Sequence, residues 1–224
     1  MRAPVSTNDL LDLRPQLTSP YRVPSSVAEV AETVRRSRFL SFASRAPDEA
    51  TAKAFVDELR QRYPDATHHC WAYNAGPPGE TARIGMSDDG EPHGTAGRPM
   101  LHAILHSEIG EVVVVCVRYY GGTKLGTGGL ARAYSSGATA ALAALRTEWR
   151  IERVVVVVTV AYDVAEAVER ALVQHDGIIR ERTFGQKVQL TTEIPVSQEH
   201  ALTEAVASVT RGTSALVRVE ETQG

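Results

Sequence analysis

The chain has 224 residues, of which 43% are hydrophobic and 23% charged, and its formal net charge is −3. This length suits one large domain or two modest ones, and the composition is ordinary for a globular protein. Residues 1–149 carry 16 basic and 16 acidic side chains, and residues 150–224 carry 8 and 11. Overall charge therefore gives no support for nucleic-acid binding, which would have to rest on a local basic patch.

The predicted elements begin after a lead-in, residues 1–20, that is rich in Pro, Ser and Thr and is expected to be flexible. Two strand-like stretches, 21–24 and 37–44, flank a segment of alternating character. Asp48 is the expected N-cap of a helix over residues 48–63. The pattern then predicts a strand at 67–75, a helix starting near Pro99, a strand at 111–119, and a long helix running from a glycine-rich turn to about Thr147.

The last third of the chain has a different order of elements, and we place a domain boundary near Trp149. Its pattern predicts a strand at 153–160, a helix capped by Asp163, a hairpin of 178–184 and 187–194, a helix from Ser197 and a strand at 215–219. This βαββαβ order is the split βαβ, or ferredoxin-like, arrangement. The expected organisation is a flexible segment 1–20, a first domain 21–149 and a ferredoxin-like domain 150–224.

Cysteine use and the N-terminal sequence favour the cytoplasm. Cys70 and Cys116 belong to no paired-cysteine motif, which argues against a structural zinc site and gives no disulfide framework. The first 20 residues lack an apolar signal core, and no apolar run approaches transmembrane length. We therefore expect a cytoplasmic protein that does not enter a membrane.

The most informative segment is the glycine-rich stretch 118–134. The span 112–147 contains no acidic residue, yet it has four basic ones: Arg118, Lys124, Arg132 and Arg146. Lys124 precedes the start of the predicted helix and Arg132 lies in its opening turns, where the helix dipole already presents partial positive charge. The five glycines leave backbone N–H groups free. This combination predicts a loop that binds an anion, most simply a phosphate.

The named nucleotide-binding motifs fit this loop poorly. Gly121 and Gly126 have the Walker A spacing, but threonine follows Gly126 where lysine is required. Gly126, Gly128 and Ala131 match G-x-G-x-x-A, but Glu148 falls before the next strand and not at its far end. The alternative to anion binding is that the glycines shape a tight turn, with the basic side chains solvated or paired to carboxylates elsewhere.

An acidic segment, 87–99, precedes the second predicted helix. Its candidate metal ligands or general acid–base groups are Asp88, Asp89, Glu91 and His93. The spacing excludes a calcium loop, whereas magnesium held by one or two carboxylates stays open. We favour a turn whose acids pair with basic side chains. Arg98, at the start of a helix, would extend the anion-binding surface.

The predicted strand 67–75 places His68 and Cys70 on one face and His69, Trp71 and Tyr73 on the other. A cysteine nucleophile served by His68 or His93 stays open, but a buried structural cysteine is the default. The two aromatic rings suit either base stacking or a hydrophobic core, and core is the commoner use.

Four motifs occur in the order RRSRFL (35–40), ATHHCWAY (66–73), SDDGEPHGTAGRP (87–99) and RYYGGTKLGTGGLARAY (118–134). Together, over about residues 20–147, they resemble the IMPACT/YigZ family. The βαββαβ tail resembles the C-terminal domain of its bacterial members. The resemblance implies an α+β protein: an N-terminal ribosomal-S5-domain-2-like domain followed by a ferredoxin-like domain similar to one in elongation factor G.

The resemblance also implies a connection with translation. Eukaryotic relatives modulate translational control by competing for the activator of an amino-acid-starvation kinase, and they associate with ribosomes. Bacteria lack that kinase pathway, so the expectation carried over is contact with RNA or the ribosome. Tyr120 replaces the family's usual phenylalanine, and His69 stands where asparagine is common. The family motif falls on Asp88, Asp89, Glu91, Arg118, Gly121, Gly122, Lys124, Gly126, Gly128, Gly129 and Arg132.

The first hypothesis is a non-enzymatic RNA- or ribosome-associated protein without metal or cofactor, in which the acidic strip 88–91 positions the basic side chains. The C-terminal domain, being acidic on balance, would meet a protein partner instead. The alternative is an enzyme that acts on a phosphorylated small molecule or nucleotide, with Asp88 or Asp89 as metal ligand or general base. The expected phosphate ligands are Arg98, Arg118, Gly121, Gly122, Lys124, Gly126, Gly128, Gly129 and Arg132.

Overall fold

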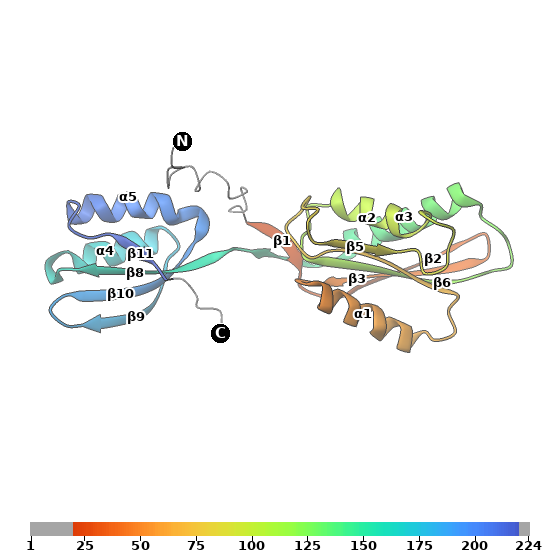
Figure 1. Cartoon of the computed structure of the whole chain (residues 1–224), viewed down its shortest axis with the longest axis horizontal. Helices are drawn as coiled ribbons and strands as arrows, with labels where there is room; N and C mark the ends of the chain where they lie inside the picture. The colour runs from red at the N-terminus through yellow and green to blue at the C-terminus, as the bar shows by residue number, and fades with distance from the viewer. Residues whose placement is uncertain (1–19, 220–224) are drawn as a thin grey trace, which may run out of the picture. The chain divides into compact units, whose positions relative to one another are not determined.

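The computed structural model describes residues 20–219, which fall into two compact units, Tyr21–Arg150 and the part that begins at Ile151. Each unit has its own sheet and its own helices (Figure 1). Residues 1–19, which make up nearly all of the predicted flexible lead-in, lie outside the described residues. No helix in the described part of the chain is long and apolar enough to cross a membrane.

The first unit is built on a five-stranded antiparallel sheet of order β2-β3-β6-β4-β5. Helix α1 (Glu49–Arg62) covers one face, and α2 (Gly97–Leu105) and α3 (Thr127–Ala144) cover the other (Figure 1). A short strand, β1 (Tyr21–Pro24), pairs with β7 (Thr147–Arg150) beside this sheet. The five strands are β2 (Ala28–Val34), β3 (Ser37–Arg45), β4 (His68–Asn74), β5 (Ile84–Ser87) and β6 (Val112–Tyr119).

Strand β6 lies at the centre of the sheet, and its sequence explains why. Val113, Val115 and Val117 pack toward α1, whereas Val114 and Cys116 pack toward α2 and α3. A strand covered on both faces reads as a continuous apolar run and not as an alternating one. The unbroken VVVVCV segment is therefore the sequence signature of this central position.

Four elements of the first unit differ from the sequence-based expectation. The alternating segment between the first two expected strands is itself a strand, β2, and β5 was not expected at all. The long helix ends at Ala144 and not near Thr147, because Leu145 is already extended at φ −65° and ψ 135°. The next residues form β7, whose partner β1 lies more than 120 residues earlier in the sequence. A pairing over that separation leaves no local signal.

The second unit has the element order β8-α4-β9-β10-α5-β11 and the sheet order β11-β8-β10-β9. Strands β8 and β9 are both antiparallel to β10, which lies between them. This arrangement confirms the ferredoxin-like prediction and, with the first unit, the α+β fold class. The elements are β8 (Arg153–Val160), α4 (Tyr162–Gln174), β9 (Ile178–Phe184), β10 (Val188–Pro195), a 3₁₀ turn (Val196–Gln198), α5 (Glu199–Thr210) and β11 (Leu216–Arg218).

One capping prediction in the second unit is wrong. Helix α4 begins after Ala161, which offers no side-chain cap, and Asp163 lies inside the first turn. There its carboxylate favours the helix through the dipole rather than through a capping hydrogen bond. By contrast, Asp48 accepts the backbone N–H of Thr51 at 2.7 Å and caps α1 as expected.

Candidate anion-binding site

The glycine-rich loop between β6 and α3 rests against the hairpin formed by β2 and β3. A Cβ on Gly121 would lie 2.0 Å from the carbonyl oxygen of Arg36, so only glycine allows this approach. The backbone N–H of Gly121 donates to Ser37 Oγ at 3.2 Å. Gly122 and Gly126 have φ of 78° and 73°, the left-handed conformation that glycine adopts without strain. Part of the glycine content therefore shapes a turn.

Arg118 is buried, with 4% of its surface exposed. Its guanidinium forms an ion pair with the Glu91 carboxylate and donates to Ser37 Oγ at 3.3 Å. The same group lies 5.3 Å from the ring centroid of Phe39 and 5.5 Å from that of Tyr120. Arg118 is thus neutralised inside the protein. The prediction that it holds a phosphate directly is corrected on that ground.

The acids of the segment 87–99 are also engaged by the protein itself. Asp88 accepts backbone N–H groups of the turn that leads into α2, from Gly94 at 2.7 Å, Ala96 at 3.0 Å and Gly97 at 2.9 Å. Burial opposes the ionisation of Asp88, but these amides more than offset it and lower its pKa. This carboxylate therefore closes the turn before α2 and has little capacity left for a ligand.

Asp89 and Glu91 make contacts of the same kind. Asp89 accepts the backbone N–H of His69 at 2.6 Å and the guanidinium of Arg60 at 3.1 Å. Glu91 accepts the hydroxyl of Tyr134 at 2.7 Å in addition to Arg118. Of the three acids, only Glu91 is paired to a basic side chain of the glycine-rich segment. In the part of the chain that the structure covers, no three His, Cys, Asp or Glu side chains gather as a metal site.

Cys70 and the aromatic pair beside it belong to the core. The Cys70 thiol donates to the backbone oxygen of Asp88 at 3.0 Å, and burial raises its pKa. His68 Nδ1 lies 2.7 Å from the backbone oxygen of Asp89. Trp71 and Tyr73 are stacked, with ring centroids 5.9 Å apart, in the layer under α1. These contacts match a structural role for the cysteine and for both rings.

We expect neither cysteine of the folded protein to react with a thiol reagent at pH 8. Both side chains are fully buried, and burial also raises the pKa of the Cys116 thiol to about 12. Because the thiolate is the reactive form, labelling should wait for unfolding. Titration with a chromogenic disulfide should give no fast thiol in buffer and two in denaturant. One fast thiol in buffer would contradict the burial of these side chains.

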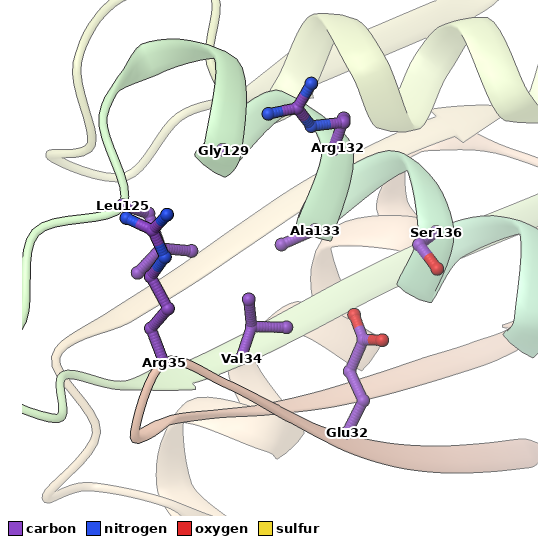
Figure 2. Close-up of a pocket in the computed structure, with 8 residues that line it drawn as sticks. All are labelled: Glu32, Val34, Arg35, Leu125, Gly129, Arg132, Ala133 and Ser136. Carbon is purple, nitrogen blue, oxygen red and sulfur yellow. The ribbon is translucent and has the colours of Figure 1, made fainter.

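A pocket of about 280 Å³ lies between the β2–β3 hairpin and the start of α3. Figure 2 shows Arg35 from the hairpin beside Leu125, and Arg132 from α3 apart from it, with Gly129 between the two guanidinium groups in this view. Glu32 and Ser136 line its other end. The ion pairs within residues 20–219 include neither arginine of the pocket.

Within the described residues, the start of α3 lacks the usual groups that compensate a helix dipole. Gly126 is the N-cap and offers no side-chain cap, and the first turn contains no acidic residue. Lys124 and Arg132 are exposed, as the sequence suggested, and Lys124 takes part in no ion pair with the described residues. Arg98 is exposed on the first turn of α2 and is not among the pocket residues.

Sequence reasoning missed Arg35 and Glu32 as site residues. Arg35 stands in the RRSRFL motif, but nothing in that motif tells which loop the hairpin tip will face. Arg35 and Arg36 form a two-residue turn in which both φ angles are positive, 46° and 72°. Two-residue turns of this kind strongly favour Asn-Gly. Two arginines at the turn between two strands were therefore a sign that the side chains at the hairpin tip have a use of their own.

Family models match both units. The model described as the Impact N-terminal domain matches residues 35–142, and a domain of unknown function matches residues 158–213. The chain is 38% identical over 201 residues to the IMPACT family member YigZ of Escherichia coli, which covers 90% of this chain and 98% of that protein. It is 30% identical over 194 residues to the IMPACT family member YvyE of Bacillus subtilis, and this match covers 87% of this chain and 88% of that protein.

A solved structure agrees with this match. It is titled "Crystal structure of an hypothetical protein", is 37% identical to this chain and superposes with a TM-score of 0.63. The likeness covers 90% of this chain and 98% of that one.

Proposed function

Because the chain belongs to the IMPACT family, we propose that it is a non-enzymatic RNA-binding protein that contacts the ribosome and modulates translation in the cytoplasm. The phosphate-binding site of this proposal is the pocket between the β2–β3 hairpin and α3. One observation carries it: Arg35 and Arg132 come from distant parts of the chain, line one pocket and have no ion-pair partner in residues 20–219.

The electrostatics of the pocket favour an anion. Arg35 and Arg132 bring two positive charges to the lining of one pocket, and the uncapped start of α3 adds partial positive charge to the same region. A phosphate would accept hydrogen bonds from both arginines, and charge-assisted bonds of this kind are stronger than neutral ones. Lys124, exposed in the adjoining loop, would add a third cationic contact.

The backbone at the hairpin tip supports a functional reading of Arg35. A non-glycine residue held at positive φ costs on the order of 1 kcal/mol, and such residues cluster at functional sites. Asn at position 35 would adopt this conformation more easily. An arginine there is understandable if its side chain is needed for binding.

This proposal revises the set of phosphate ligands. We assign direct contacts to Arg35, Lys124 and Arg132 and to the free amides at the start of α3, where Gly126, Gly128 and Gly129 stand. Gly121 and Gly122 would shape the loop, and Arg98 would extend the basic surface. Arg118 and Glu91 would act from inside, by fixing the loop, and Asp88 and Asp89 would hold the segment that leads into α2.

The enzymatic alternative has less support. Asp88 accepts three backbone N–H groups, and Asp89 is held by Arg60 and by the backbone of His69. A general base or a magnesium ligand needs an oxygen that faces the substrate, and these oxygens are already used. The C-terminal part of the chain, residues 150–224 with 8 basic and 11 acidic side chains, would be better suited to a protein partner than to RNA.

The test is a double substitution, Arg35→Asn with Arg132→Gln. Removing two charge-assisted contacts should weaken binding of single-stranded RNA by about tenfold or more. The slope of log affinity against log salt should become shallower by about 0.7 for each lost contact. Fluorescence anisotropy with labelled RNA across a salt series measures both quantities, and co-sedimentation with ribosomes over the same series extends the test.

The matched control is Lys53→Gln, which removes an exposed charge from α1 on the opposite face of the sheet. This variant should bind RNA like the wild-type protein. Asn at position 35 suits the positive φ, so loss of binding cannot be ascribed to a broken hairpin. If the double variant and the control bind RNA equally, this pocket is not the site.

A further inference from the structure

The end of the pocket opposite the two arginines contains an unsatisfied acceptor. Glu32 projects from β2 on the side that faces α3, at the level of Ser136 (Figure 2). Its Oε1 atom is buried and has no hydrogen-bond partner. Burial also raises the pKa of this carboxyl group above its usual value. A turn of the Glu32 side chain toward the pocket would bring this oxygen to the N–H groups of a ligand, which would relieve the energetic cost of a buried acceptor without a donor.

The pocket therefore has two chemically different ends with an apolar strip between them. Arg35 and Arg132 lie near the start of α3, Glu32 lies about one helical turn further along, and Leu125, Val34 and Ala133 supply the apolar contacts (Figure 2). A ligand that fits must carry an anion, a flat body of low polarity and a set of hydrogen-bond donors, in that order. The volume of about 280 Å³ is near the lower limit of ordinary ligand pockets, so the ligand is small.

A nucleotide has this layout, and its base can be chosen by its donors. Guanine presents N1–H and N2–H₂ side by side on its Watson–Crick edge, which matches the two oxygens of one carboxylate. Adenine and cytosine present an amino group next to an acceptor nitrogen, which would face the second oxygen unfavourably. Uracil presents one N–H between two carbonyl oxygens.

We propose that this pocket selects a guanine nucleotide of single-stranded RNA, with its phosphate on Arg35 and Arg132 and its N1–H and N2–H₂ donated to the Glu32 carboxylate. This inference rests on the proposed function and deepens it, because it assigns base selectivity to a protein otherwise expected to read only phosphates. Val34 and Ala133, which lie between the two ends of the pocket, would contact the base, and Glu32 is the specificity-determining residue.

The experiment compares short uridine-rich oligoribonucleotides that differ only at one central base. An oligonucleotide with guanine should bind the wild-type protein about tenfold more tightly than those with adenine, cytosine or uracil, since one bidentate pair gives discrimination of this order. An oligonucleotide with inosine, which keeps N1–H but lacks the 2-amino group, should bind with an affinity between that for guanine and those for the other three bases. Guanosine 5′-monophosphate is titrated in parallel as the free nucleotide.

Glu32→Gln is the decisive variant. A glutamine amide accepts one donor but opposes the other, so the preference for guanine should vanish while binding of the uridine-rich oligonucleotide stays equal or rises. Glu29→Gln, on the same strand with its side chain toward α1, is the charge-matched control and should keep the preference. Both variants should fold, because Glu32→Gln removes an unpartnered charge.

The outcomes separate the two proposals. Equal affinity for all four bases in the wild-type protein, or a preference that survives Glu32→Gln, overturns the guanine pocket and leaves RNA binding intact. No binding of any oligonucleotide together with tight binding of guanosine monophosphate overturns the RNA proposal and supports a guanine site for free nucleotides. If neither an oligonucleotide nor guanosine monophosphate binds, the RNA proposal and the guanine pocket are both overturned.

Discussion

Replacing Glu91 by alanine is expected to destabilise the first unit by about 3–5 kcal/mol, because it leaves the buried guanidinium of Arg118 without its counter-charge. Arg118 is 4% exposed and Glu91 is 8% exposed, so water cannot replace the missing carboxylate. The Tyr134 hydroxyl also loses its acceptor, and burial, which raises its pKa, keeps it a donor that needs one. The loss of the counter-charge and the loss of the hydrogen-bond acceptor both lower the stability of the first unit.

Urea denaturation followed by tryptophan fluorescence is a clean measurement of this effect. The two tryptophans, Trp71 and Trp149, both lie in the first unit, so the signal reports the unfolding of that unit. Adding Arg118→Met to Glu91→Ala should recover part of the lost stability, since both charges are then gone. Glu49→Ala, which breaks the exposed pair with Lys53, should cost less than about 1 kcal/mol. A Glu91→Ala variant as stable as this control would refute the buried ion pair.

The acid-free span 112–147 illustrates what a sequence can predict about charge. Its four basic side chains suggested uncompensated positive potential, and for Lys124 and Arg132 no ion pair is found in residues 20–219. For Arg118, which lies in β6, the inference failed, because its counter-ion comes from Glu91, 27 residues earlier in the segment that leads into α2. A stretch of sequence without acidic residues can therefore still have an acidic side chain beside it in the folded protein. The possibility that acids of 88–91 pair with this segment was visible, but which acid meets which base depends on the sheet.

Local and non-local features of the fold divide in the same way. The apolar run of β6 and the alanine-rich α3 follow from local sequence patterns, although the predicted C-terminal end of α3 lay about three residues too far along the chain. Strand β7 depends on pairing with β1, and the position of the glycine-rich loop depends on its contact with the β2–β3 hairpin. Both partners are distant in the sequence. The pocket is also formed by segments that are distant in the sequence, the β2–β3 hairpin and the start of α3. For this reason Arg35 and Glu32 were not recognised as its residues.

Two alanine substitutions within the glycine-rich segment should have opposite effects on stability. Gly121→Ala would place a methyl group 2.0 Å from the Arg36 carbonyl oxygen and 2.5 Å from the backbone nitrogen of Ser37. Both obstacles are backbone atoms, so the loop or the hairpin must move, and overpacking of this kind costs about 1–3 kcal/mol or more. Gly128→Ala meets no atom within 4 Å and lies in the first turn of α3. Alanine is the better helix former there, so stability should rise by up to about 1 kcal/mol.

Gly121→Ala also tests whether the position of the loop matters for binding. Ser37 Oγ accepts from the Gly121 amide and from Arg118, so a displaced loop also weakens the second hydrogen bond of the buried arginine. RNA affinity should therefore fall together with stability in Gly121→Ala. Gly128→Ala, at a position assigned to the phosphate site, serves only as the comparison for stability. Denaturation of both variants and anisotropy titration of Gly121→Ala measure these quantities. If Gly121→Ala keeps the stability and the RNA affinity of the wild type, the close approach of loop and hairpin does not fix the site.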